Sequence, residues 1–69
     1  MYDYTEIAKE IQKTALGEAF YGNSLLVAKD IPSITQEERN ILDSFLTGRN
    51  TFEDRIELQN IAIKIRKLI

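Results

Sequence analysis

Carboxylates are the main reactive groups in this sequence, because it contains no histidine and no cysteine. The commonest general base, the thiol nucleophile and the usual transition-metal ligands are therefore missing. Glu53, Asp54 and Glu57 stand close together in the stretch TFEDRIE, and Glu53 and Glu57 would share one face of a helix. Such oxygens can bind Mg²⁺ or Ca²⁺, but no glycine-containing ligand loop accompanies them. We therefore expect no metal site.

A second group of acids, Glu37 and Glu38, could be read as an acid and base pair. Neighbouring side chains on a helix point about 100° apart, and Glu38 is better explained as part of a helix cap. The sequence also lacks a glycine-rich phosphate loop, a G-x-S-x-G elbow and an S-x-x-K motif. We therefore expect a protein that is not an enzyme and that binds no cofactor.

The composition indicates one folded domain over residues 1–69. Hydrophobic residues make up 43% and charged residues 29% of the chain, and a chain of this length can build only one small core. Its longest apolar run, residues 25–28, is too short to cross a membrane, and no basic N-terminal region precedes an apolar one. Together with the absence of cysteine, this predicts a cytoplasmic protein.

The sequence of the first half predicts one long helix and one segment whose secondary structure the pattern does not decide. Asp3 and Glu6 have the spacing of an N-cap and its supporting acid, and apolar residues then recur at helical intervals up to residue 19. We expect a helix over 4–21, in which Gly17 is a weak point or a close contact and which Gly22-Asn23 ends. Residues 25–30 form either a short helix capped by Ser24, which we favour, or an extended segment.

The second half predicts a helical hairpin over residues 36–68. Thr35 and Glu38 form a T-x-x-E capping box before a helix over 36–47, which Gly48 is expected to end. The last helix, over 51–68, is capped either by Asn50 with Glu53 or by Thr51 with Asp54. The prediction is an all-α fold, a small bundle of three helices with the short segment as an optional fourth. The two long helices are expected to flank the helix over 36–47.

The last helix carries two apolar stripes on different faces. One consists of Leu58, Ile61, Ala62, Ile65, Leu68 and Ile69, and the other, about 150° away, of Phe52, Ile56 and Ile63. A helix wedged between two others would need both stripes. Alternatively, one stripe is a surface for a partner. The spacing of the first stripe also matches the start of a coiled-coil seam, although it covers only about one and a half heptads.

These features favour a small regulatory or interaction protein that presents a helical apolar surface to a protein partner or to a second copy of itself. The sequence does not decide which stripe is used. The candidate contact residues are Phe52, Ile56, Ile63, Leu58, Ile61, Ile65 and Leu68.

The alternative is a DNA-binding helix-turn-helix protein that uses the hairpin over 36–68, since two helices joined by a short glycine-containing turn have that outline. Its contact residues would be Arg49, Asn50, Arg55, Lys64, Arg66 and Lys67. A net charge of −2 and the acids at the start of the last helix oppose contact with phosphates. Nucleic acid is thus the less favoured partner, and the same charge balance gives no reason to expect binding to an anionic membrane.

Overall fold

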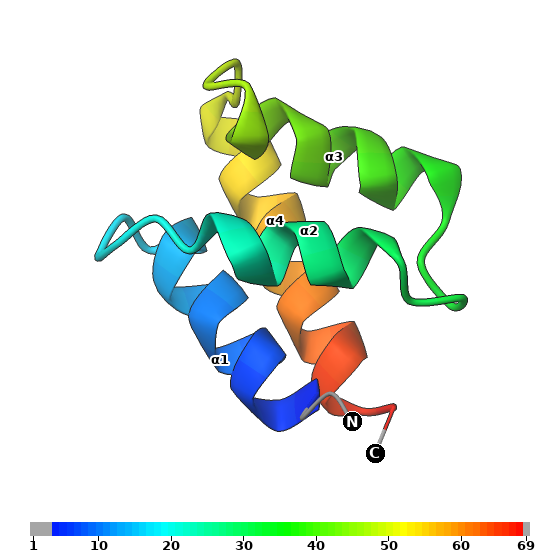
Figure 1. Ribbon diagram of the computed structural model, residues 1–69. Helices are drawn as coiled ribbons and strands as arrows, with labels where there is room; N and C mark the ends of the chain where they lie inside the picture. The colour runs from blue at the N-terminus through cyan, green and yellow to red at the C-terminus, as the bar shows by residue number, and fades with distance from the viewer. Residues whose placement is uncertain (1–3, 69) are drawn as a thin grey trace.

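The computed structural model describes residues 4–68, which form four α-helices and no strand (Figure 1). The helices are α1 (Tyr4–Ala15), α2 (Gly22–Lys29), α3 (Gln36–Leu46) and α4 (Phe52–Arg66). The all-α prediction and the helical hairpin are confirmed. The short helix that we favour for residues 25–30 is present as part of α2 and ends at Lys29. The predicted cap at Asp3 and the contribution of Ile69 to the core lie outside the described residues.

The helices form two pairs that cross each other. α1 and α4 run antiparallel, so that α1 begins near the end of α4, and α2 with α3 lies across this pair (Figure 1). The predicted order, in which the two long helices flank α3, is wrong, because α1 packs against α4 itself and α1 and α3 do not pack together. Ala8, Ala15 and Ala62 are all buried, and such small side chains let two helices approach closely.

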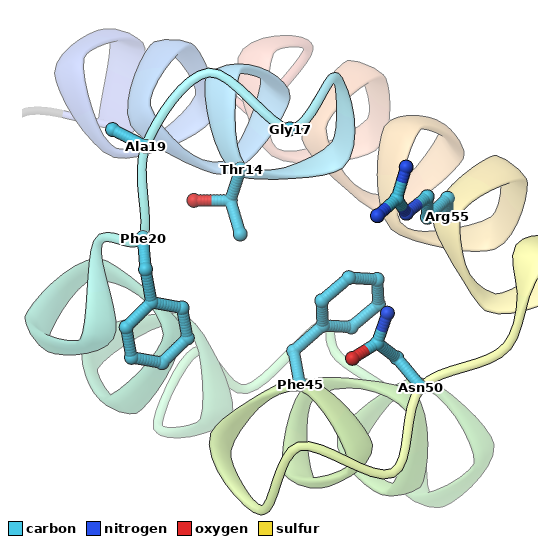
Figure 2. Close-up of a pocket in the computed structure, with 7 residues that line it drawn as sticks. All are labelled: Thr14, Gly17, Ala19, Phe20, Phe45, Asn50 and Arg55. Carbon is cyan, nitrogen blue, oxygen red and sulfur yellow. The ribbon is translucent and has the colours of Figure 1, made fainter.

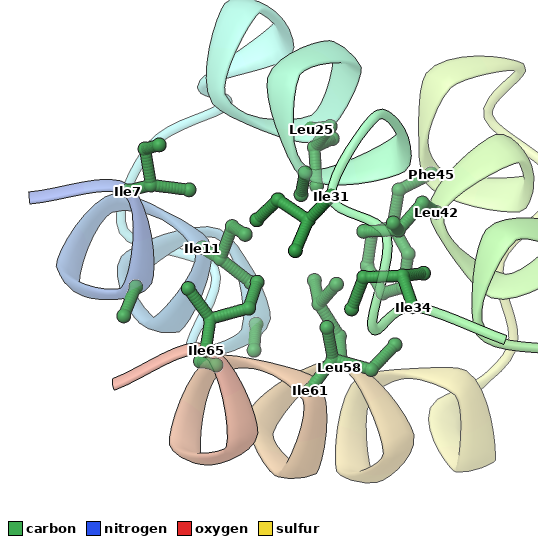
Figure 3. Packing of buried hydrophobic residues seen from close by; sticks show 14 residues of the cluster. Ile7, Ile11, Leu25, Ile31, Ile34, Leu42, Phe45, Leu58, Ile61 and Ile65 are labelled. Carbon is green, nitrogen blue, oxygen red and sulfur yellow. The ribbon is translucent and has the colours of Figure 1, made fainter. Parts of the chain in front are cut away.

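The core lies between the two pairs of helices (Figure 3). It is built from the buried residues Ile7, Ala8, Ile11, Ala15, Leu25, Ala28, Ile31, Ile34, Leu42, Phe45, Leu58, Ile61, Ala62 and Ile65. Ile31 and Ile34 lie in the connection between α2 and α3, and their burial in the core fixes the position of this connection. Full burial of an isoleucine or leucine side chain contributes about 1.5–3 kcal/mol to folding, which makes this cluster the main source of stability.

The first helix ends at Ala15 instead of near Tyr21, and Gly17 is the reason. Gly17 has a φ of +78°, its N–H donates to Thr14 O (3.1 Å), and the N–H of Glu18 donates to Lys13 O (3.0 Å). This hydrogen-bond pattern is the Schellman motif, which ends helices at a left-handed glycine. The interpretation of Gly17 as a position inside the helix is therefore wrong.

The start of α2 also differs from the prediction. Gly22 is the first residue of α2 and does not end α1, and the residue before it, Tyr21, makes no side-chain cap bond. Ser24 is not a cap but lies buried inside α2, where its hydroxyl donates a hydrogen bond to the Glu10 carboxylate of α1. The side chain of Ser24 therefore links two helices.

The caps of the helical hairpin follow the prediction. Thr35 and Glu38 form the expected capping box of α3, and Thr51 with Asp54 forms that of α4, which decides between the two predicted caps. Gly48 has a φ of +73°, and the N–H of the residue after it donates to Ser44 O (2.8 Å), so a second Schellman motif ends α3. The hairpin turn is therefore fixed on both sides by local hydrogen bonds.

Glu38 ties this hairpin together at its other end. Its Oε1 accepts hydrogen bonds from the Thr35 N–H (2.8 Å) and from Lys64 Nζ of α4 (2.7 Å). Partial burial acts to raise the pKa of the Glu38 carboxyl, but the hydrogen bonds from Lys64 and Thr35 and the charge of Lys64 outweigh it and lower that pKa from its ordinary value of 4.5. The folded state therefore holds a proton at Glu38 less tightly than the unfolded state does.

We expect Glu38→Gln to lower the free energy of unfolding at pH 7 by about 1 kcal/mol, because it removes an ion pair and weakens a capping box. The stability that Glu38 contributes is fully present above pH 4.5 and is lost as the pH falls through the lower folded pKa. Urea unfolding at a series of pH values should show the two proteins converging below pH 4.5. A difference that stays constant down to about pH 3 would contradict this.

Candidate functional site

One of the two apolar stripes of α4 is exposed to solvent. It consists of Phe52, Ile56 and Ile63 and is here called the outer stripe. The solvent-exposed fractions of these residues are 77%, 51% and 46%. Leu58, Ile61 and Ile65 of the other stripe are at most 1% exposed, and Leu68 is packed against the core. The interpretation of α4 as a helix wedged between two others is therefore wrong, because its neighbours α1 and α3 cover only one face.

Burial narrows the set of candidate contact residues. Leu58, Ile61 and Ile65 belong to the core, so no partner can contact them while the fold is intact. The outer stripe spans three turns of α4 and, at 100° per residue, its members lie within about 40° of one another. It faces away from the core, so all three side chains are open to a partner at once.

Charged residues border the outer stripe, and most of them are basic. By helical position, Arg55 and Arg66 lie along one edge, while Glu53 and Lys67 lie along the other. Among residues 4–68, no hydrogen bond or ion pair is formed by the side chains of Arg55, Arg66 and Lys67. The border therefore carries a net positive charge that no described side chain neutralises, although the whole chain is acidic.

The candidate nucleic-acid contacts differ in their exposure and in their partners. Lys64 is held by Glu38 at 2.7 Å, so it is not a free cation. Asn50 is half-buried, whereas Arg49, Arg55, Arg66 and Lys67 are exposed. The exposed face of α4 carries the apolar side chains of the outer stripe. A recognition helix in a DNA groove would need groups there that hydrogen-bond base edges.

A pocket of about 250 Å³ opens where the loop between α1 and α2 meets the turn between α3 and α4 (Figure 2). It is lined by Thr14, Gly17, Ala19, Phe20, Phe45, Asn50 and Arg55. Phe45 reaches the pocket from the edge of the core, and the ring of Phe20 stands on the opposite side, 59% exposed. Sequence reasoning missed this pocket, because its residues come from five separate parts of the chain.

Arg55 and Asn50 are the polar side chains of the pocket that have no partner among residues 4–68. The hydroxyl of Thr14 is already used, since it donates to Glu10 O (3.0 Å) and accepts from the Tyr21 N–H (3.3 Å). In Figure 2 the guanidinium of Arg55 lies above the ring of Phe45, on the side of the pocket away from Phe20. The pocket thus combines two phenyl rings with one unpaired cation and one carboxamide.

The acids considered as metal ligands are Glu53, Asp54 and Glu57, and Asp54 has a structural role. Asp54 accepts hydrogen bonds from the Thr51 N–H (2.9 Å) and, at 3.4 Å, from the Ser44 hydroxyl, so it serves the cap of α4. Within residues 4–68, no group of three or more acidic side chains is arranged to hold a metal ion. None of the described helices has the length and apolar character needed to span a membrane.

Comparisons of the chain with protein-family models, with curated proteins and with solved structures found no match. The outer stripe, its charged border and the pocket are therefore the features of this protein that bear on its function.

Proposed function

We propose that this protein is a small non-enzymatic interaction protein that binds an amphipathic helix of a regulated partner along the outer stripe of α4. The observation that carries the proposal is the exposure of Phe52, Ile56 and Ile63 on one face of a helix whose opposite face builds the core. Folding does not require large apolar side chains at these positions. A helix laid along α4 would cover all three at once, as in other complexes in which an amphipathic helix docks on an apolar surface.

The size of the outer stripe favours a transient complex. A stable interface buries about 800 Å² on each partner, which would be close to a fifth of the 4527 Å² surface of this protein. Three side chains on three turns of one helix cover less than that. An obligate homodimer would bury still more, so another protein is favoured over a second copy of this chain.

The border of the stripe specifies the charge of the partner. Arg55, Arg66 and Lys67 are unpaired and flank the apolar side chains, while Glu53 is the single acid beside them. Opposite charges at the rim of an interface guide the encounter and exclude wrong partners. The favoured partner is a helix with apolar residues at intervals of three and four and with acidic residues beside them.

DNA is the competing ligand for the same helix. Two observations favour a protein partner over DNA. Lys64 is paired with Glu38, and the outer stripe presents apolar side chains where a DNA-binding helix needs groups that hydrogen-bond base edges. If a labelled duplex pool binds at low salt, where phosphate contacts are strongest, and Ile56→Glu leaves that binding intact, the helix-turn-helix function is the better account.

We expect Ile56→Glu to weaken capture of the native partner at least tenfold, which corresponds to about 1.4 kcal/mol. The substitution places a charge in the middle of the outer stripe without touching the core. The protein, immobilised and exposed to extract from its native host, should retain a partner that the variant loses. Quantitative mass spectrometry of the retained proteins measures the difference.

Leu26→Glu is the matched control for this experiment. Leu26 lies on α2 with 52% exposure, against 51% for Ile56, so both substitutions exchange an equally exposed apolar side chain for an acid. The control should retain the partner like the unmodified protein. Equal retention by all three proteins would contradict the proposal. A concentration-dependent dimer in sedimentation, dissociated by Ile56→Glu alone, would assign the stripe to self-association instead.

A further inference from the structure

We propose that the pocket between the α1–α2 loop and the α3–α4 turn binds a carboxylate that is attached to an apolar group of about the size of one side chain. This site contains none of the apolar residues of the outer stripe and shares only Arg55 with the border of that stripe. Its test does not depend on the proposed helix partner.

The volume limits what can enter. Pockets for drug-sized ligands and cofactors measure about 300–1,000 Å³, whereas this one measures about 250 Å³. A nucleotide or a larger cofactor would not be enclosed. A single phenyl or branched aliphatic group fits between the rings of Phe20 and Phe45, which provide apolar walls on two sides (Figure 2).

The polar lining selects a carboxylate. The planar guanidinium of Arg55 can bind both oxygens of a carboxylate through parallel N–H bonds, and no acid of the described chain occupies it. Asn50 lies on the same side of the pocket and can donate through its amide (Figure 2). The ligand would therefore place its apolar group between the rings and its carboxylate at Arg55.

The charge of the surroundings argues against a phosphate dianion. Arg55 is the one cation in the lining, and it follows Glu53 and Asp54 in the first turn of α4. The second charge of a dianion would therefore have no cationic partner in the lining. A singly charged acid matches one guanidinium.

The walls of the pocket are held in place before any ligand arrives. The Schellman motif at Gly17 and the hydrogen bond from the Tyr21 N–H to Thr14 fix the two ends of the α1–α2 loop. The ring of Phe20 lies against Gly22, where an added Cβ would come within 3.2 Å of its Cε1. The capping box of Thr51 and Asp54 fixes the turn that carries Arg55. Preorganised walls reduce the entropy lost on binding.

The test is an NMR titration of the ¹⁵N-labelled protein with two probes that differ in one group, N-acetylphenylalanine and N-acetylphenylalanine amide. The acid should shift the amide signals of Gly17, Asn50 and Arg55 with a dissociation constant of about 1 mM, as expected for so small a ligand. The amide should bind about tenfold more weakly, because it lacks the charge that pairs with Arg55.

Arg55→Gln should remove this preference for the acid. Lys9→Gln is the matched control, because it deletes the same charge from an exposed position of α1 outside the pocket, and it should leave the preference unchanged. Two further probes distinguish the source of the ligand. Tighter binding of phenylacetate would assign the pocket to a free acid, and tighter binding of N-acetyl-Gly-Gly-Phe would assign it to a protein C-terminus.

Three results would overturn the proposal. The first is the absence of shifts around the pocket with either probe at about 10 mM, ten times the expected dissociation constant. The second is an equal response to the acid and the amide in the unmodified protein. The third is tighter binding of uridine monophosphate than of the acid, which would assign Arg55 to a phosphate.

Discussion

Leu58→Ala is expected to lower the free energy of unfolding by about 2–5 kcal/mol. Leu58 is fully buried in the face of α4 that packs on the rest of the bundle, so the substitution removes apolar contacts and leaves a cavity. A chain of this length has a total stability of only about 3–10 kcal/mol. The variant should therefore lose a large part of its folded population under conditions in which the unmodified protein is stable.

Phe52→Ala is the matched variant on the opposite face. Phe52 is 77% exposed, and truncation of a surface side chain usually changes the free energy of unfolding by less than about 0.5 kcal/mol. Urea titrations followed by circular dichroism measure both values. Comparable losses in the two variants would contradict the assignment of one stripe to the core and the other to the surface.

Gly17→Ala is expected to cost about 1–2 kcal/mol, the second largest effect. Gly17 has a φ of +78°, and an L-residue pays this amount for the left-handed conformation because its Cβ approaches the following carbonyl. Space is not the reason, since an added Cβ would be 3.8 Å from its nearest neighbour, Nη1 of Arg55. The loss should thus appear as a lower urea midpoint with an unchanged slope.

Gly17→Asn separates backbone strain from other causes. Asparagine adopts the left-handed conformation more readily than alanine does, so it should lose less stability although its side chain is larger. If Gly17→Asn is at least as destabilising as Gly17→Ala, steric contact at this position governs the loss, and the explanation by helix termination is wrong.

The helix caps show what the sequence predicts well. Thr35 with Glu38 and Gly48 define α3 through interactions that span at most five residues, so the local sequence contains the whole signal. The end of α1 is a different case. Ala15 and Ala19 continue the apolar spacing past Gly17, and the periodicity alone extends the helix. The bond from Tyr21 to Thr14, seven residues apart, helps to hold the chain in a loop instead.

The two stripes of α4 mark the limit of pattern analysis. The spacing of Phe52, Ile56 and Ile63 identifies an apolar face correctly, but whether another helix covers that face depends on how the helices are arranged. The prediction placed α3 between the long helices, whereas α1 packs on α4 directly and leaves the outer face open. Burial is a property of the assembled fold, which one helix cannot reveal.

The pocket could not be predicted for a related reason. Phe20, Phe45 and Arg55 are far apart in the sequence and have no shared motif, so only the folded chain brings them together. Arg55 and Asn50 were predicted as contacts, but for DNA and on the basis of charge and turn position. The structure places them at the opening of a small apolar pocket, where the same donors favour a carboxylate.

The most direct test of the proposed function is photo-crosslinking from the outer stripe in the native host. A photoreactive phenylalanine analogue at position 56 should form an adduct of higher mass with one predominant protein, because this side chain would lie inside the complex. The same analogue at position 26, an equally exposed site on α2, should form no such adduct. The absence of a specific adduct at position 56, or the same adduct at both positions, would contradict the assignment of this face of α4 to a protein partner.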